Sequence, residues 1–92
     1  MSGERVSKRV VVHGNVQGVF FRDSTQTEAE SKGVAGWVTN RSDGAVEAVF
    51  EGEAGAVQAM VDFARSGPSS ADVDDVEVSD QEPEGLSGFE VR

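Results

Sequence analysis

A short segment rich in glycine and ending in arginine is the first pattern in this sequence with a chemical meaning. The segment GNVQGVFFR covers residues 14–22. Glycine-rich backbone can turn several N–H groups toward one anion, and a helix N-terminus adds partial positive charge. The guanidinium of Arg22 is permanently charged and matches phosphate oxygens two at a time. The segment therefore predicts an anion-binding loop. A plain connection whose Arg22 pairs with a surface carboxylate fits the loop alone equally well.

A second polar residue, Asn40, stands where a strand is expected to end. It follows the run GWVT at residues 36–39 and shares a strand face with Gly36 and Val38 by the period of two. A carboxamide can accept a proton from water and donate to another oxygen, so Asn40 could orient a nucleophile without acting as a base. Taken alone, an asparagine beside a turn more often satisfies backbone groups of the hairpin.

Composition excludes several classes of protein. The 92 residues carry 17 Asp and Glu against 8 Lys and Arg, a net charge of −9, which opposes binding to nucleic acid and to anionic membranes. Cysteine is absent, which excludes disulfides, thiolate nucleophiles and Cys-ligated metals. The acidic surface favours adaptation to concentrated salt, with an ordinary acidic surface as the alternative. Without a long apolar run or an apolar signal core, we expect a cytoplasmic protein.

Hydrophobic periodicity predicts seven elements in one domain over residues 1–92. Four β-rich runs and a short terminal run alternate with two helical segments. The first helix ends at Gly33, and the second ends at Gly67 and Pro68. The expected strands are 6–13, 34–41, 45–52, a run through Val73, Val76 and Val78, and 89–91; the expected helices are 22–32 and a segment through Val57, Met60, Val61 and Ala64.

This order predicts an α+β fold, the ferredoxin-like sandwich βαββαβ, with two helices on one face of an antiparallel sheet. The first helix should turn Phe21, Thr25, Ala29 and the stem of Lys32 inward. The strand over 45–52 should bury Val46, Ala48 and Phe50 on one face and leave Glu47 and Glu51 wet on the other.

The two motifs together resemble the paired signatures of the acylphosphatase family. GNVQGVFFR is followed by GWVTNRSDGAVEAVFEG over residues 36–52, and the similarity extends to the terminal GFEVR. The resemblance implies an enzyme that hydrolyses acyl phosphates to carboxylate and phosphate without metal or cofactor. It implies that Arg22 binds the phosphate and that Asn40 positions the attacking water. It also implies that the phosphate accepts from the loop amides of Asn15, Val16, Gln17, Gly18 and Val19.

The chemistry suits these residues, since an acyl phosphate releases a carboxylate whose conjugate acid has a pKa of about 4 and needs little protonation. We expect a monomer that takes a small acyl phosphate as substrate and is inhibited competitively by inorganic phosphate. The alternative is a non-catalytic ferredoxin-like module that binds a phosphorylated metabolite and regulates a partner. His13 is expected to be structural, and the roles of Arg41 and Ser42 stay open.

Overall fold

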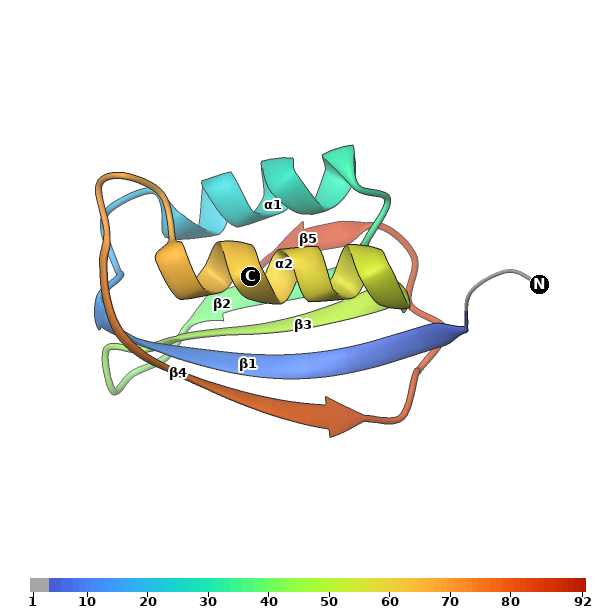
Figure 1. The fold of residues 1–92 in the computed structure, drawn as a ribbon. Coiled ribbons are helices and arrows are strands. Elements are labelled where there is room, and N and C mark those ends of the chain that lie inside the picture. The colour runs from blue at the N-terminus through green and yellow to red at the C-terminus, as the bar shows by residue number, and fades with distance from the viewer. Residues whose placement is uncertain (1–3) are drawn as a thin grey trace.

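The computed structural model describes residues 4–92, which form two helices packed on one face of a five-stranded sheet (Figure 1). The predicted single domain over 1–92 stays a prediction, because residues 1–3 lie outside the described part. Neither helix in the described residues has the length and apolar character needed to cross a membrane. The elements are β1 (Arg5–Asn15), α1 (Phe21–Ser31), β2 (Ala35–Asn40), β3 (Val46–Glu53), α2 (Ala54–Ser66), β4 (Asp72–Gln81) and β5 (Phe89–Val91).

The strand order is β4-β1-β3-β2-β5, which confirms the ferredoxin-like α+β fold. The first four strands pair antiparallel as predicted, but β5 pairs parallel with β2, with Gly36 opposite Phe89. The prediction of a wholly antiparallel sheet is therefore wrong at this edge. The reason is that β4 ends at the end of the sheet where β2 begins, so the segment 82–88 crosses that end and β5 enters alongside β2 in the same direction (Figure 1).

The core lies between the helices and the sheet, and small β-branched side chains from the strands fill most of it. Phe21, Thr25 and Ala29 of α1 are buried as predicted, and the Phe21 ring packs 6.5 Å from the ring of Phe63 on α2. The inward position predicted for Lys32 is wrong: the residue is exposed, and its Nζ pairs with Glu28 at 2.9 Å. Because Lys32 lies beyond the last turn of α1, its stem does not continue the buried stripe.

β1 continues two residues past the predicted end at His13, because an irregular pairing with β4 accommodates Gly14. The register shifts between His13 and Gly14, so that Gly14 lies opposite Val73. Gly14 has a φ of 132°, and a Cβ there would lie 2.2 Å from the carbonyl oxygen of Asp72. Only glycine fits this close approach, and the bulge sets the direction in which the chain leaves the sheet.

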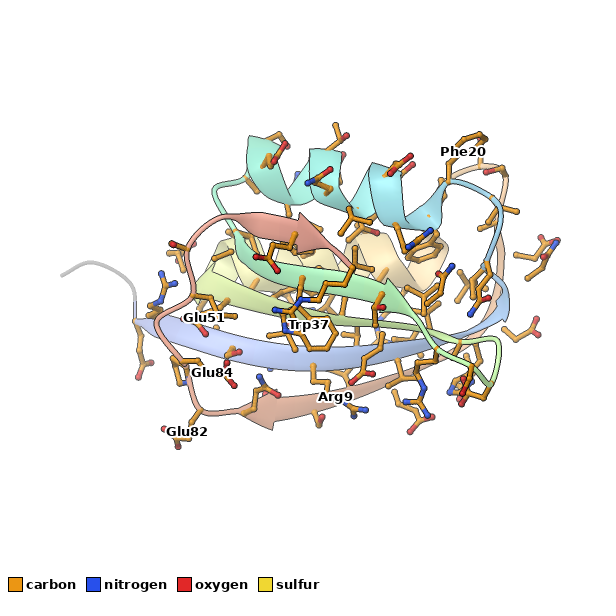
Figure 2. All side chains as sticks on the ribbon, turned by 180° about the vertical axis from the view of Figure 1, so that it is seen from behind. Arg9, Phe20, Trp37, Glu51, Glu82 and Glu84 are labelled. Carbon is orange, nitrogen blue, oxygen red and sulfur yellow. The ribbon has the colours of Figure 1, made fainter. Side chains whose placement is uncertain are left out.

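The prediction that Glu51 lies on a solvent-exposed face of β3 is wrong. Val46, Ala48 and Phe50 are buried toward the helices as expected, but Glu51 on the opposite face has no exposed surface. Its carboxylate accepts hydrogen bonds from the main-chain N–H groups of Glu84 at 2.8 Å, Gly85 at 2.9 Å and Leu86 at 3.0 Å, and from Arg5 Nε at 3.0 Å. Figure 2 shows Glu51 and Glu84 together at this end of the sheet. Glu51 therefore fastens the crossing segment that leads into β5.

These contacts determine the charge state of Glu51. Burial raises the pKa of its carboxyl group, but the main-chain N–H groups of Glu84 and Leu86 and the guanidinium of Arg5 outweigh burial, and the pKa falls below its usual value of 4.5. A lowered pKa in the folded state means that the carboxylate stabilises the fold at neutral pH. This contribution is lost as the pH falls through the folded-state pKa.

We expect Glu51→Gln to lower the free energy of unfolding by about 2–3 kcal/mol at neutral pH, because an amide NH₂ group then faces main-chain donors. The difference from wild type should begin to shrink as the pH falls below about 4.5, where the carboxyl group of the unfolded wild type takes up a proton, and should be lost as the pH passes the lower pKa of the folded state. Urea unfolding at several pH values measures both effects. Glu47→Gln, on the same strand and face, is the matched control and should cost less, since the carboxylate of Glu47 binds Arg9 alone among residues 4–92.

Candidate active site

A pocket of about 250 Å³ opens where β1 leads into α1 and β2 ends. It joins Asn40 to residues between Val16 and Asp23, which lie far from it in the sequence. Both motifs singled out in the sequence therefore contribute to one pocket. Its lining consists of Val16, Gly18, Phe20, Phe21, Arg22, Asp23 and Asn40. Three of the predicted phosphate-binding residues, Asn15, Gln17 and Val19, do not line the pocket.

Residues 16–20, here called the 16–20 loop, leave their main-chain donors available. Within residues 4–92, the N–H groups of Gln17, Gly18, Val19 and Phe20 donate to no protein acceptor. The φ angle is positive at Gly18 (73°) and Phe20 (63°) but not at Val19. Backbone whose φ alternates in sign turns successive N–H groups toward a common point, and such concavities bind anions. Of the five predicted phosphate-binding residues outside α1, Asn15 differs, because it lies in β1 opposite Asp72.

Arg22 lies in the first turn of α1 and is held by a main-chain oxygen rather than by an Asp or Glu side chain of the described residues. Its Nη1 donates to the main-chain oxygen of Arg92 at 3.0 Å, and it forms no ion pair within the described residues. Thr39 Oγ1 donates to the same oxygen at 3.2 Å. Within the described residues, Arg22 therefore pairs with no Asp or Glu side chain, and its partner is the main-chain oxygen of the last residue in the sequence. Arg22 also lines the pocket.

The main-chain oxygen that holds Arg22 is itself fixed by the β2 edge. The N–H of Arg92 donates to the carbonyl oxygen of Val38 at 2.8 Å, which continues the pairing of β5 with β2. The guanidinium of Arg92 lies 4.8 Å from the centre of the Trp37 ring, in a cation–π contact on the open face of the sheet. The short strand β5 thus positions Arg22 at the start of α1, because Arg22 donates to the main-chain oxygen of Arg92.

Asn40 is the last residue of β2 and lies opposite Val46. Gly36, Val38 and Asn40 share the face that packs toward the helices, as predicted. The side chain of Asn40 forms no hydrogen bond within the described residues, and the residue lines the pocket. The interpretation in which Asn40 satisfies the hairpin backbone is not supported, because Gln17 does this instead.

The side chain of Gln17 connects the 16–20 loop to the hairpin between β2 and β3 through hydrogen bonds. Its Nε2 donates to the carbonyl oxygens of Arg41 at 2.8 Å and Ala45 at 2.9 Å. On the other side of the loop, Ser70 Oγ donates to the carbonyl oxygen of Val19 at 2.6 Å. These three bonds fix the loop relative to the strand end that carries Asn40. The sequence predicts Gln17 only as a main-chain donor, and its side chain shows a second role.

Arg41 and Asp43 stabilise the hairpin turn. Arg41 Nη2 binds Asp43 at 2.9 Å, and Asp43 Oδ1 accepts from the N–H of Ala45 at 3.1 Å. The hydrogen bond from Ala45, aided by Arg41, holds the pKa of Asp43 below its usual value. Ser42 is exposed in the turn and does not line the pocket.

His13 and the carboxylates show no metal-binding arrangement in the described part of the chain. His13 Nε2 lies 2.6 Å from Glu77 on β4, and His13 does not line the pocket. No group of three potential ligands among residues 4–92 has a geometry that could hold a metal ion.

Comparisons with known proteins identify the family of the chain. The family model for acylphosphatase matches residues 8–91. An acylphosphatase of Rubrobacter xylanophilus is 56% identical, covering 100% of this chain and 86% of its own length. One from Haloquadratum walsbyi is 50% identical, covering 100% and 99%. The crystal structure of acylphosphatase from Bacillus subtilis superposes with a TM-score of 0.91 at 39% identity, covering 95% of this chain and 98% of that one. The chain therefore belongs to the acylphosphatase family.

We expect Gln17→Ala to lower the free energy of unfolding by about 1–2 kcal/mol, because two carbonyl oxygens lose a donor. Binding of inorganic phosphate should weaken as well, because the loop amides lose their fixed position relative to Asn40. Urea unfolding and calorimetry with phosphate measure these effects. The matched control is Gln58→Ala, which removes an exposed glutamine whose side chain binds Asp62 on α2 and no other residue of the described part. Unchanged phosphate binding in Gln17→Ala would show that the loop holds its shape without this tie.

Proposed function

We propose that this chain hydrolyses acyl phosphates to a carboxylate and inorganic phosphate by attack of water on phosphorus. Membership of the acylphosphatase family supports the reaction. Arg22, Asn40, Gly18 and Phe20 line one pocket, and the N–H groups of Gly18 and Phe20 have no protein acceptor among residues 4–92, which supports the assignment of roles. In this proposal Arg22 and the amides of residues 15–19 bind the phosphoryl oxygens, while Asn40 positions the water. The bond from phosphorus to the acyl oxygen breaks, and its electron pair leaves with the carboxylate.

The chemistry requires positioning and charge stabilisation more than acid or base catalysis. Charge on the transferring phosphoryl group is spread over its outer oxygens, where N–H donors and a guanidinium stabilise it. The leaving carboxylate has a conjugate acid with a pKa of about 4 and departs without a proton donor. Asn40 can accept a hydrogen bond from the water through its amide oxygen, which orients the water toward phosphorus. None of these steps calls on a metal ion.

Two further points of the proposal concern the molecule in solution. We expect inorganic phosphate to compete with the substrate, since the proposed site binds mainly the phosphoryl group. We also expect a monomer, because the buried core is completed within one chain and every buried side-chain polar atom among the described residues has a partner. Cytoplasmic location stays a prediction of the sequence.

Two substitutions separate the proposed roles of the site residues. Arg22→Ala should lower kcat for benzoyl phosphate by at least ~100-fold and abolish inhibition by inorganic phosphate, because the anion loses its guanidinium. Asn40→Ala should lose turnover to a similar extent while phosphate still binds in calorimetry. Turnover by wild type should be unaffected by EDTA.

Arg65→Ala is the control for charge, because Arg65 is exposed in the last turn of α2 and away from the pocket. Near-normal kcat in Asn40→Ala would refute the water-positioning role. A folded wild type that binds phosphate but turns over no acyl phosphate would favour the regulatory module over the enzyme.

We also propose that the acidic surface is adapted to concentrated salt. Five exposed carboxylates lie on the edge strand β4, and three of them, Asp72, Asp74 and Asp75, form no ion pair within the described residues. Their mutual repulsion acts over a Debye length of about 10 Å at 0.1 M salt and about 3 Å at 1 M. At high ionic strength, the same screening reduces the long-range repulsion between a protein of charge −9 and an anionic substrate.

Circular dichroism tests the salt adaptation. The chain should be largely unfolded in dilute buffer and should fold as KCl is raised into the molar range, because screening removes the repulsion between carboxylates. Replacing both Asp72 and Asp74 by Asn should lower the KCl concentration needed for folding. A stability that does not change with salt in either protein would contradict the proposal.

A further inference from the structure

Phe20 lies at the rim of the pocket in a conformation that its side chain does not favour. The residue is 75% exposed, and its φ and ψ of 63° and 21° are left-handed. It is the one residue other than glycine with a positive φ among residues 4–92. Bulky side chains rarely adopt this region, and strain of this kind concentrates at functional sites. Figure 2 shows Phe20 beside the start of α1, at the end of the molecule opposite Glu51, where it extends away from the sheet.

The fold gains little packing from this ring. Phe20 is not among the residues that form or flank the hydrophobic core, whereas its neighbours Val19 and Phe21 are. Phe20 and Val78 are the large hydrophobic residues that the described part of the chain exposes, and Phe20 is the more exposed of the two. Of this pair, Phe20 alone lines the pocket. A ligand bound in the pocket would therefore give the ring of Phe20 an apolar contact.

Asp23 contributes a negative charge to the same pocket. The residue is exposed, it lines the pocket, and its carboxylate forms no hydrogen bond or ion pair within the described residues. Arg22 is the one cationic residue in the lining, and in the proposed function it is occupied by the phosphoryl group. No second positive charge remains in the lining to bind an anionic group on the acyl side.

We propose that Phe20 and Asp23 form an acyl subsite that selects substrates with an apolar or aromatic, uncharged acyl group over those whose acyl group carries a carboxylate. This rests on the proposed function, because it places the phosphoryl group at Arg22 and the loop amides. The pocket volume of about 250 Å³ is near the lower end of small-molecule sites, about 300 Å³, which leaves room for a small acyl group beside the phosphate. The ring of Phe20 packs against the acyl group, and Asp23 repels an acyl carboxylate.

The contribution of Phe20 is measured by the ratio of kcat/KM for benzoyl phosphate to that for acetyl phosphate. Phe20→Asn removes the ring but keeps a residue that tolerates the left-handed conformation, so the loop should keep its shape. The ratio should fall about three- to tenfold, as expected for the loss of one aromatic contact. Phe20→Leu keeps an apolar surface and should retain part of the ratio. Val78→Thr changes the other exposed hydrophobic residue and should leave the ratio unchanged.

The contribution of Asp23 is measured by the ratio of kcat/KM for succinyl phosphate to that for acetyl phosphate. Asp23→Asn removes a charge that opposes the free carboxylate of the succinyl group, so this ratio should rise about three- to fivefold. Using a ratio cancels any general effect of the charge on the phosphoryl group. Asp62→Asn, an exposed aspartate on α2, is the matched control and should leave the ratio unchanged.

The two proposals fail in distinguishable ways. If wild type and variants hydrolyse acetyl phosphate and are inhibited by inorganic phosphate, but neither ratio changes, the acyl subsite is wrong and the proposed function stands. If wild type hydrolyses none of the three acyl phosphates, the proposed function is wrong and the subsite with it.

Discussion

The position of β5 beside β2 is the constraint on which the proposed site depends. Glu51, buried on the open face of the sheet, accepts three main-chain hydrogen bonds from residues 84–86 and thereby fastens the segment that leads into β5. The parallel pairing of β5 with β2 then fixes the main-chain oxygen of Arg92, to which Arg22 donates. A carboxylate at one end of the sheet is thus linked to a guanidinium at the other through residues 84–92 and their hydrogen bonds.

The pocket combines several features that do not stabilise the fold. Among the described residues, the 16–20 loop leaves main-chain donors without a protein acceptor, Phe20 adopts a left-handed conformation, and Arg22 pairs with no Asp or Glu side chain. The left-handed backbone of Phe20 is strained, and in the proposed function the free donors and the guanidinium bind an anion with an apolar substituent. Gln17 and Ser70 hold the loop in place, so the donors are positioned before the ligand arrives.

Much of this molecule could be predicted from its sequence. Periodicity located both helices and the strands, with α1 displaced by one residue, and the paired motifs indicated the pocket residues Arg22 and Asn40. What periodicity could not reveal were contacts between distant segments. The burial of Glu51 depends on main-chain donors more than 30 residues away, and the parallel pairing of β5 depends on the path of residues 82–88. The exposure of Phe20 depends on a left-handed backbone that its residue type argues against.

Hydrolysis in water enriched in ¹⁸O shows whether a water molecule attacks the phosphorus atom of the bound phosphoryl group, which is the chemical step proposed for this pocket. Benzoyl phosphate would be turned over by the wild-type enzyme in concentrated KCl with EDTA, and both products would be analysed by mass spectrometry after correction for spontaneous hydrolysis. We expect the label to enter inorganic phosphate and benzoate to stay unlabelled. Label in benzoate would show attack at the acyl carbon and would refute attack on phosphorus.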